Sequence, residues 1–144
     1  MTGEPSSVRG HRTVAHTADV IVEAWGPDVA SCCEEAVSAL LEGFIDASSA
    51  KVVERLDIDL APSTAETTLL ALLDEVLFVV DTADVVPVAV HVAPAPTGAV
   101  RVRLDGADPR SVEPTGAAPK AISRSGLRVH VEPTRVECAF IVDV

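Results

Sequence analysis

The sequence predicts an α+β protein in which two helices pack on one face of a largely antiparallel β-sheet. Two segments carry apolar residues at steps of three and four positions, a spacing typical of amphipathic helices. Most other apolar residues recur at every second position, which is typical of strands. Strands and two helices in this order fit a two-layer structure. A length of 144 residues suits one domain, so we expect a flexible N-terminus over 1–10 and a single domain over 11–144.

The first expected elements are a strand, a helix and a second strand. Val20–Trp25 is rich in β-branched residues and ends at Gly26-Pro27, a turn that favours the start of a helix. Val53–Leu60 alternates apolar and charged residues, which predicts a strand exposed to water on one side. Between them, a helix over roughly 28–44 is predicted by an apolar stripe of Val29, Cys32, Cys33, Ala36, Val37, Leu40, Leu41 and Phe44.

A second helix is expected over roughly 64–81. Ser63 and Glu66 have the three-residue spacing of a capping box, which marks the start of a helix. Its apolar stripe consists of Leu69, Leu70, Leu73, Val76, Leu77 and Val80.

Four strands are expected to complete the domain, at Val86–Val92, Val100–Leu104, Leu127–Val131 and Val136–Val142. Pro87 has no N–H to donate, so the first of these strands belongs at a sheet edge. Pro94–Gly98 predicts a hairpin loop. The long loop Asp105–Pro119 has the length of loops that are functional or mobile.

Composition excludes several classes of function. The net charge of −11 disfavours direct binding to a phosphate backbone. Aromatic residues make up only 3% of the chain, too few for a base-stacking platform, so we expect a core of Val, Ala and Leu. Met1–Gly10 has no apolar stretch, and Leu69–Val80 is too short to span a bilayer, so we expect a cytoplasmic protein. The three cysteines show neither disulfide nor zinc spacing and are expected to be reduced and packed.

Candidate functional residues lie near both ends of the chain. The segment His16-Thr17-Ala18-Asp19 precedes the first strand, and its plain interpretation is a turn that caps this strand. Arg135–Val144 is expected to run as a strand to its last residue, which brings Asp143 and the terminal carboxylate of Val144 together at a strand end; a frayed, solvated end is the plain interpretation. If the last strand lies near Asp19, these anionic groups need a proton or a cation between them. Oxygen ligands select Ca²⁺, Mg²⁺ or Mn²⁺ over zinc.

Two further residues are candidates for the same site. Asp46 follows the first helix and is either a further acidic ligand or a residue of the turn after the helix. Lys120 is one of only two lysines and stands directly after the long loop, at the expected entry to a strand. It is either a solvated charge, the counter-charge of a carboxylate site, or a contact for an anionic group on a partner.

Taken together, these motifs resemble the archease family over essentially the whole chain. The resemblance rests on their joint order: His16-Thr17-Ala18-Asp19, Glu23-Ala24-Trp25-Gly26, the helix ending in Asp46, Leu73-Asp74-Glu75, Lys120-Ala121-Ile122 and Ile141-Val142-Asp143-Val144. It implies a small α+β protein that is not an enzyme and that assists the GTP-dependent RNA ligase of tRNA splicing and RNA repair. In this family the accessory protein promotes guanylylation of the ligase and its multiple turnover.

The resemblance also implies roles for individual residues. Asp19 and Asp143 are expected to bind a divalent metal ion, Ca²⁺ or Mg²⁺/Mn²⁺, with a main-chain or terminal oxygen of Val144 as a further ligand and Asp46 nearby. Lys120 matches a functionally needed lysine. The sequence departs from the family at Ser123-Arg124, where Thr-Tyr is common, and at Gly106-Ala107, where Gly-Glu is usual. Contacts of that strand and loop with a partner are therefore expected to differ.

Three functional hypotheses follow. The leading one is a metal-binding accessory protein whose acidic body docks on a ligase with a basic active site. An alternative is a stand-alone metal-dependent hydrolase in which Asp19 and Asp143 hold the ion and His16 acts as the base. The third is an interaction domain without metal. No Gly-rich phosphate loop or histidine-ligand spacing favours the hydrolase.

Overall fold

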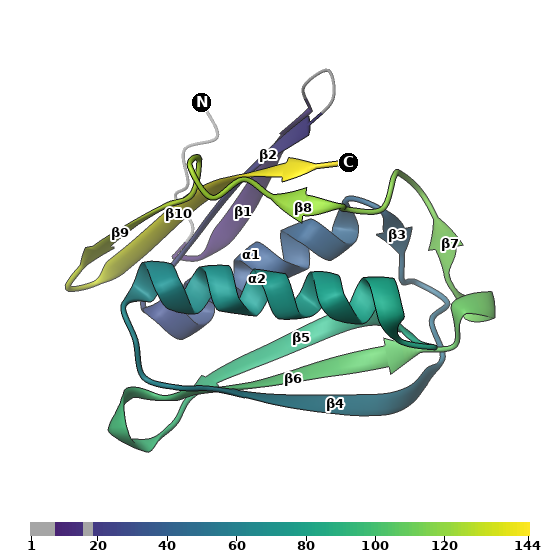
Figure 1. Cartoon of the computed structure of the whole chain (residues 1–144), viewed down its shortest axis with the longest axis horizontal. Coiled ribbons are helices and arrows are strands. Elements are labelled where there is room, and N and C mark those ends of the chain that lie inside the picture. Colours follow the sequence, from purple (N-terminus) through teal and green to yellow (C-terminus); the bar gives the residue numbers. More distant parts are fainter. Residues whose placement is uncertain (1–7, 16–18) are drawn as a thin grey trace.

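Two antiparallel sheets enclose the two helices, as the computed structural model shows for residues 8–15 and 19–144 (Figure 1). The larger sheet has the order β1-β2-β10-β8, and β9 also pairs with β10. Every pairing in it is antiparallel. Its strands are β1 (Gly10–Ala15), β2 (Asp19–Gly26), β8 (Ala121–Ile122), β9 (Arg128–Glu132) and β10 (Arg135–Asp143).

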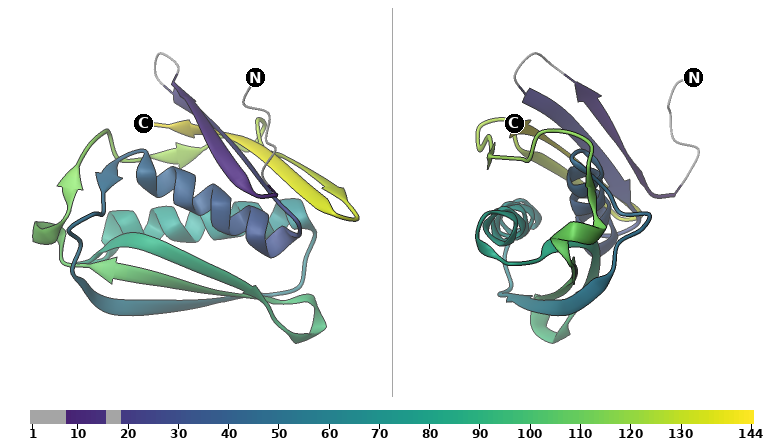
Figure 2. Two further views of the ribbon diagram at one scale, coloured as in Figure 1. Left: turned by 180° about the vertical axis from the view of Figure 1, so that it is seen from behind. Right: turned by 90° about the vertical axis from the view of Figure 1, so that its right-hand side faces the viewer.

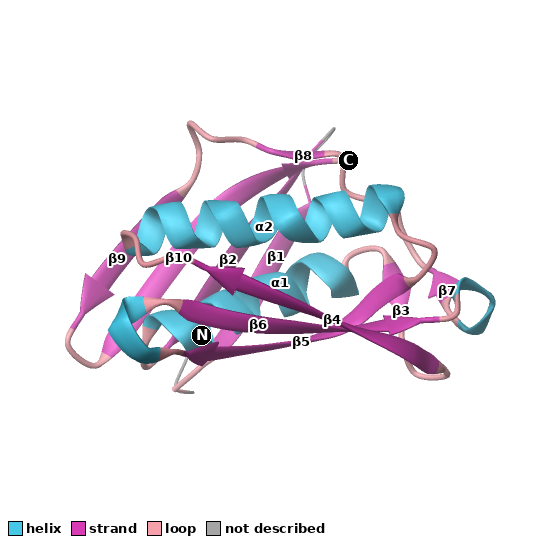
Figure 3. Ribbon diagram, turned by 60° about the horizontal axis from the view of Figure 1, so that its bottom comes forward, coloured by secondary structure: helices cyan, strands magenta, loops and turns pink. Residues whose placement is uncertain are grey.

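The second sheet has three antiparallel strands in the order β4-β6-β5. They are β4 (Val52–Leu60), β6 (Val100–Ala107) and β5 (Val86–Pro94), shown from below in Figure 3. A separate pair joins β3 (Ile45–Asp46) to β7 (Glu113–Pro114). Both helices lie between the two main sheets in the views of Figures 1 and 2. Helix α1 (Val29–Glu42) contacts β2 on one side and β5 on the other, and α2 (Ala65–Thr82) contacts β8, β9 and β5.

The first helix starts at a reciprocal hydrogen-bonded cap. The carboxylate of Asp28 accepts from the Ser31 N–H at 2.8 Å, and the Ser31 hydroxyl accepts from the Asp28 N–H at 3.2 Å. The backbone hydrogen bond from Ser31 holds the pKa of Asp28 below its usual value. Gly26 fits this turn because a Cβ there would lie 2.3 Å from the Ser31 hydroxyl oxygen. The predicted helix is therefore confirmed, with its first helical residue at Val29.

The second helix is also confirmed, but its cap lies one residue later than predicted. The Thr64 side chain, not Ser63, accepts from the Thr67 N–H at 3.1 Å. Thr64 has extended backbone angles, whereas helical geometry begins at Ala65. Glu66 lies in the first turn, where a negative charge is favoured. No helix of the described residues is long and apolar enough to cross a membrane.

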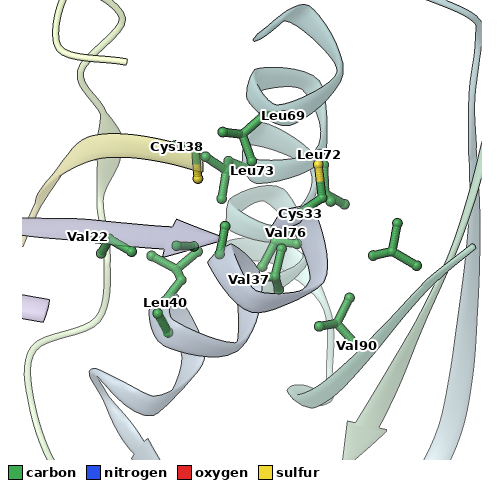
Figure 4. Packing of buried hydrophobic residues seen from close by; sticks show 14 of the residues in the cluster. Val22, Cys33, Val37, Leu40, Leu69, Leu72, Leu73, Val76, Val90 and Cys138 are labelled. Carbon is green, nitrogen blue, oxygen red and sulfur yellow. The ribbon is translucent and has the colours of Figure 1, made fainter. Parts of the chain in front are cut away.

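Aliphatic side chains from both helices and both main sheets form the core (Figure 4). Leu69, Leu73 and Val76 of α2 belong to the same buried cluster as Val37 and Leu40 of α1. All three cysteines are free and buried, as predicted, and burial raises the pKa of Cys33 to about 12. The thiols therefore behave as small apolar groups.

The structure confirms the α+β class, the antiparallel pairing and the two helices. The strands divide among separate sheets, whereas the sequence pattern predicts both helices on one face of a single sheet. The alternation of apolar and polar residues indicates which face of a strand is exposed to solvent, but it does not indicate which strand pairs with it. β5 is an edge strand, as Pro87 predicts, and the ladder shifts register between Pro87 and Ala89.

Some short elements were not predicted. β1 precedes the first expected strand, and the predicted loop 105–119 contains the end of β6, a 3₁₀ turn at Pro109–Ser111 and β7. β7 has only two residues, too few to show a readable period. Residues 1–7 of the predicted flexible N-terminus lie outside the described residues.

Ionic contacts hold β1 and the residue before it against α1. Both ring nitrogens of His11 face carboxylate oxygens, Nδ1 at 2.8 Å from Glu35 and Nε2 at 2.9 Å from Glu42. Arg9 pairs with Glu34 and Glu35. Burial opposes the charged imidazole, but the hydrogen bonds from Glu35 and Glu42 outweigh it and raise the pKa of His11. This arrangement ties the edge strand to the helix most strongly when His11 is protonated.

We predict that His11→Gln removes a pH-dependent part of the stability. Because the folded-state pKa of His11 is raised, its contribution is fully present below the ordinary histidine pKa and is lost as the pH rises through the folded-state value. Urea unfolding of the parent should show up to about 1 kcal/mol of stabilisation that is lost as the pH rises above the ordinary histidine pKa. His11→Gln should lack this slope. His130→Gln, at an exposed histidine of β9, should keep it; a slope retained by His11→Gln would contradict the assignment.

Candidate functional site

Strand pairing brings Asp19 and Asp143 together. Asp19 is the first residue of β2 and Asp143 the last of β10, and the antiparallel register places them directly opposite each other. Directly opposite residues have their side chains on the same face, with Cβ atoms about 4.5–5.5 Å apart. The two candidate acidic residues, 124 positions apart in sequence, are thus neighbours in space.

The acidic pair lies on the face of the sheet that points away from α1. Alternation turns Val22, Phe140 and Val142 inward, where each is at most 2% exposed. Asp19 and Asp143 therefore face outward, with Asp143 exposed and Asp19 half-buried. Burial of the alternate residues fixes which face the carboxylates occupy, because a shift of one residue would expose the core.

The segment around β8 fixes the position of Lys120. The Lys120 N–H donates to the Asp143 carbonyl at 2.7 Å, and Ala121 lies opposite Asp143 in the register. The Ser123 N–H donates to the Ile141 carbonyl at 2.9 Å. The Lys120 side chain is exposed. The strand expected after Lys120 is present as the two-residue β8, and it places the lysine backbone beside the acidic pair.

Val144 is half-buried where several elements meet. A small cavity of about 30 Å³ is lined by Val144 together with Gly43 and Phe44, which follow α1, and Thr13 of β1. Val144 also lines the groove that contains Lys120. Val144 therefore lies between the small cavity and the groove, directly after Asp143.

The structure describes Asp46 in a different local setting. Asp46 is exposed in β3, and its Oδ1 accepts from the Ser48 N–H at 2.9 Å. This backbone hydrogen bond holds the pKa of the Asp46 carboxyl below its usual range. Over residues 8–15 and 19–144, no group of three or more His, Cys, Asp or Glu residues is placed to hold one ion. His16 lies outside the described residues.

The donor chemistry of the acidic pair suits a hard cation. Two carboxylates on one face of the sheet offer oxygen ligands. Such ligands favour Ca²⁺, Mg²⁺ or Mn²⁺. Thiolate ligands are excluded here because all three cysteines are buried in the core. Like charges this close also repel, which a cation between them relieves.

A groove beside this site was missed by the sequence analysis. It runs between α2 and the segment that leads into β8, and Phe78 on α2 is 63% exposed within it. A signal was present in the sequence: Val76–Val80 is apolar at five consecutive positions, more than one buried stripe can use. One of these residues had to face away from the core.

Comparison with known proteins supports the family expected from the motifs. The chain is 34% identical over 142 residues to the probable protein archease of Mycobacterium tuberculosis, which covers 99% of this chain and 79% of that protein. It is 25% identical over 135 residues to the archease-like protein of Dictyostelium discoideum, covering 90% and 89% of the two chains.

Two solved structures share the fold. The solution structure of Methanobacterium thermoautotrophicum protein 1598 has a TM-score of 0.74 at 20% identity, covering 94% of this chain and 99% of that one. The crystal structure of an archease, possible chaperone, from Thermotoga maritima has a TM-score of 0.64 at 16% identity, covering 92% and 96%. Residues 11–144 also match the Archease protein family. This chain therefore belongs to the archease family.

Proposed function

We propose that this protein is an accessory factor that promotes guanylylation and multiple turnover of a GTP-dependent RNA ligase, in tRNA splicing or RNA repair, through a divalent ion held at its acidic edge. The observation that carries the proposal is the directly opposed pair Asp19 and Asp143, beside the fixed backbone of Lys120. The family to which the chain belongs supports the accessory role.

Charge supports a protein partner over direct binding of RNA. The chain carries a net charge of −11, and the edge with the proposed ion site presents two carboxylates. A ligase that handles GTP and RNA needs a basic active site, and complementary charge speeds the encounter of two proteins. The related structure from Thermotoga maritima is described as a possible chaperone, a role that also requires a protein partner.

The proposed ligands are Asp19, Asp143 and a main-chain oxygen of Val144, with Asp46 as a further, less firmly placed candidate. A divalent ion at this edge would supply charge neutralisation for the phosphates during nucleotidyl transfer. The two carboxylates hold their position because their strands are anchored in the core. Lys120 extends from the same edge, where its ammonium group can contact an anionic group of the partner or substrate.

We predict that divalent ions stabilise the parent protein but not Asp143→Asn. An ion that binds only the folded state adds about 2.7 kcal/mol at 100 times its Kd. Thermal melts in chelator and in Ca²⁺, Mg²⁺ or Mn²⁺ should show a rise of several degrees in Tm for the parent. In chelator, Asp143→Asn should be at least as stable as the parent, because it removes repulsion across the pair. Asp84→Asn, at an exposed aspartate between α2 and β5, serves as the control and should respond like the parent. Identical ion responses in the parent and Asp143→Asn would remove the ion site.

We predict that Lys120→Ala weakens ligase activation while leaving the fold intact. The side chain is exposed, so its loss should change stability by no more than about 0.5 kcal/mol. The measurement is guanylylation of the ligase with GTP and divalent ion, at increasing concentrations of the accessory protein. Lys51→Ala removes the only other lysine, which is also exposed, and should activate like the parent.

The same assay separates the other hypotheses. No stimulation by the parent over a range of ion and protein concentrations would overturn the accessory role. Hydrolysis of simple phosphoesters without ligase would instead favour the hydrolase alternative. Stimulation that survives in Asp143→Asn would leave an accessory protein that works without this ion.

A further inference from the structure

A groove of about 1060 Å³ lies next to the acidic edge, between α2 and the segment that leads into β8. Figure 3 shows β8 and the C-terminus beside α2. The wall formed by α2 includes Asp74, Phe78 and Asp81, and the opposite wall includes Lys120 and Ile122. Val144, the residue after Asp143, also lines the groove.

Phe78 is the feature that marks this groove as a contact surface. The chain has four aromatic residues, and Trp25, Phe44 and Phe140 are all buried. Phe78 alone among them is exposed, at 63%. Aromatic side chains are enriched in protein interfaces and dominate their binding energy.

Charge defines what kind of segment the groove can accept. Asp74 and Asp81 stand four residues before and three residues after Phe78, so all three lie on one face of α2. Across the groove, Arg124 makes an ion pair with Asp74 at 3.5 Å, and both side chains are largely exposed. An exposed pair of this kind contributes little stability and is easily exchanged. The α2 wall is therefore anionic around an apolar centre.

We infer that this groove seats a segment of the ligase that carries an apolar side chain beside a basic one. The apolar side chain packs on Phe78 and Ile122, and the basic one meets Asp81. This inference rests on the proposed function, because the groove shares Lys120 and Val144 with the acidic edge. A ligase that engages Asp19 and Asp143 from the side of Lys120 also covers the groove. The acidic wall disfavours RNA as the occupant.

The test separates binding from activation. Titration of the ligase with each variant gives Kd, and guanylylation at saturating accessory protein gives the maximal stimulation. Phe78→Ala and Asp81→Lys should each raise Kd about tenfold or more. Maximal stimulation should stay at the parental value, because neither residue belongs to the ion site. Thermal melts should show no core-like loss of Tm for Phe78→Ala, since the ring is exposed.

Matched controls make the comparison specific. Val131→Ala shortens another exposed apolar side chain, at 56% exposure on β9, and Glu54→Lys makes the same change of charge as Asp81→Lys on β4. Both controls should bind the ligase like the parent.

Three outcomes would overturn the inference. If Phe78→Ala binds like the parent while the parent still stimulates the ligase, the groove is not the contact, although the proposed function stands. If sedimentation shows that the parent is a dimer and Phe78→Ala a monomer, the occupant is a second copy. If the parent binds single-stranded RNA and Phe78→Ala does not, the occupant is nucleic acid. A parent that neither binds nor stimulates the ligase overturns the proposed function itself.

Discussion

The antiparallel pairing of β2 with β10 is the interaction on which the rest of the structure depends. It joins a strand from the start of the domain to the last strand of the chain, and the same register faces Val22 and Phe140 toward α1. A slip of one residue would turn both side chains outward. Because burial fixes the register, the residues at the strand ends have no freedom in their partners. The opposition of Asp19 and Asp143 is thus a consequence of core packing.

The two helices and the long strands were predictable because the spacing of apolar residues within each segment is enough to identify it. The apolar stripes of the helices and the alternation of the long strands are set by contact with a single buried layer. Two features escaped prediction because they depend on distant partners. The strands divide between two sheets around the helices, and β3 pairs with β7 across almost seventy residues of sequence. The cap at Thr64 was missed for a subtler reason: Ser63 and Thr64 are both good caps, and only the backbone angles distinguish them.

The candidate site was predictable only in part. Asp19 and Asp143 stood out because each adjoins a clear strand, but their register is a long-range property that no spacing in the sequence contains. The backbone hydrogen bond from Lys120 to Asp143 was equally invisible, because it depends on where β8 joins the sheet. Phe78 was hidden within an apolar run, where composition does not reveal which residue faces the solvent.

Burial of apolar side chains on one face of the β2–β10 pair explains how two like charges can be held together on the other face. Repulsion across a directly opposed pair of carboxylates at the edge of a sheet costs a fraction of a kcal/mol to about 1 kcal/mol. Burial of a single large side chain such as Phe140 contributes about 1.5–3 kcal/mol, which exceeds that cost. The core therefore holds the two carboxylates close together, so the proposed ion site would not need to be ordered on binding. Groups that serve stability lie on the inner face of the β2–β10 pair, and groups available for function lie on its outer face and rim. We therefore expect that substitution of Asp143, on this outer face, or of Phe78, on the exposed side of α2, changes binding without unfolding the protein.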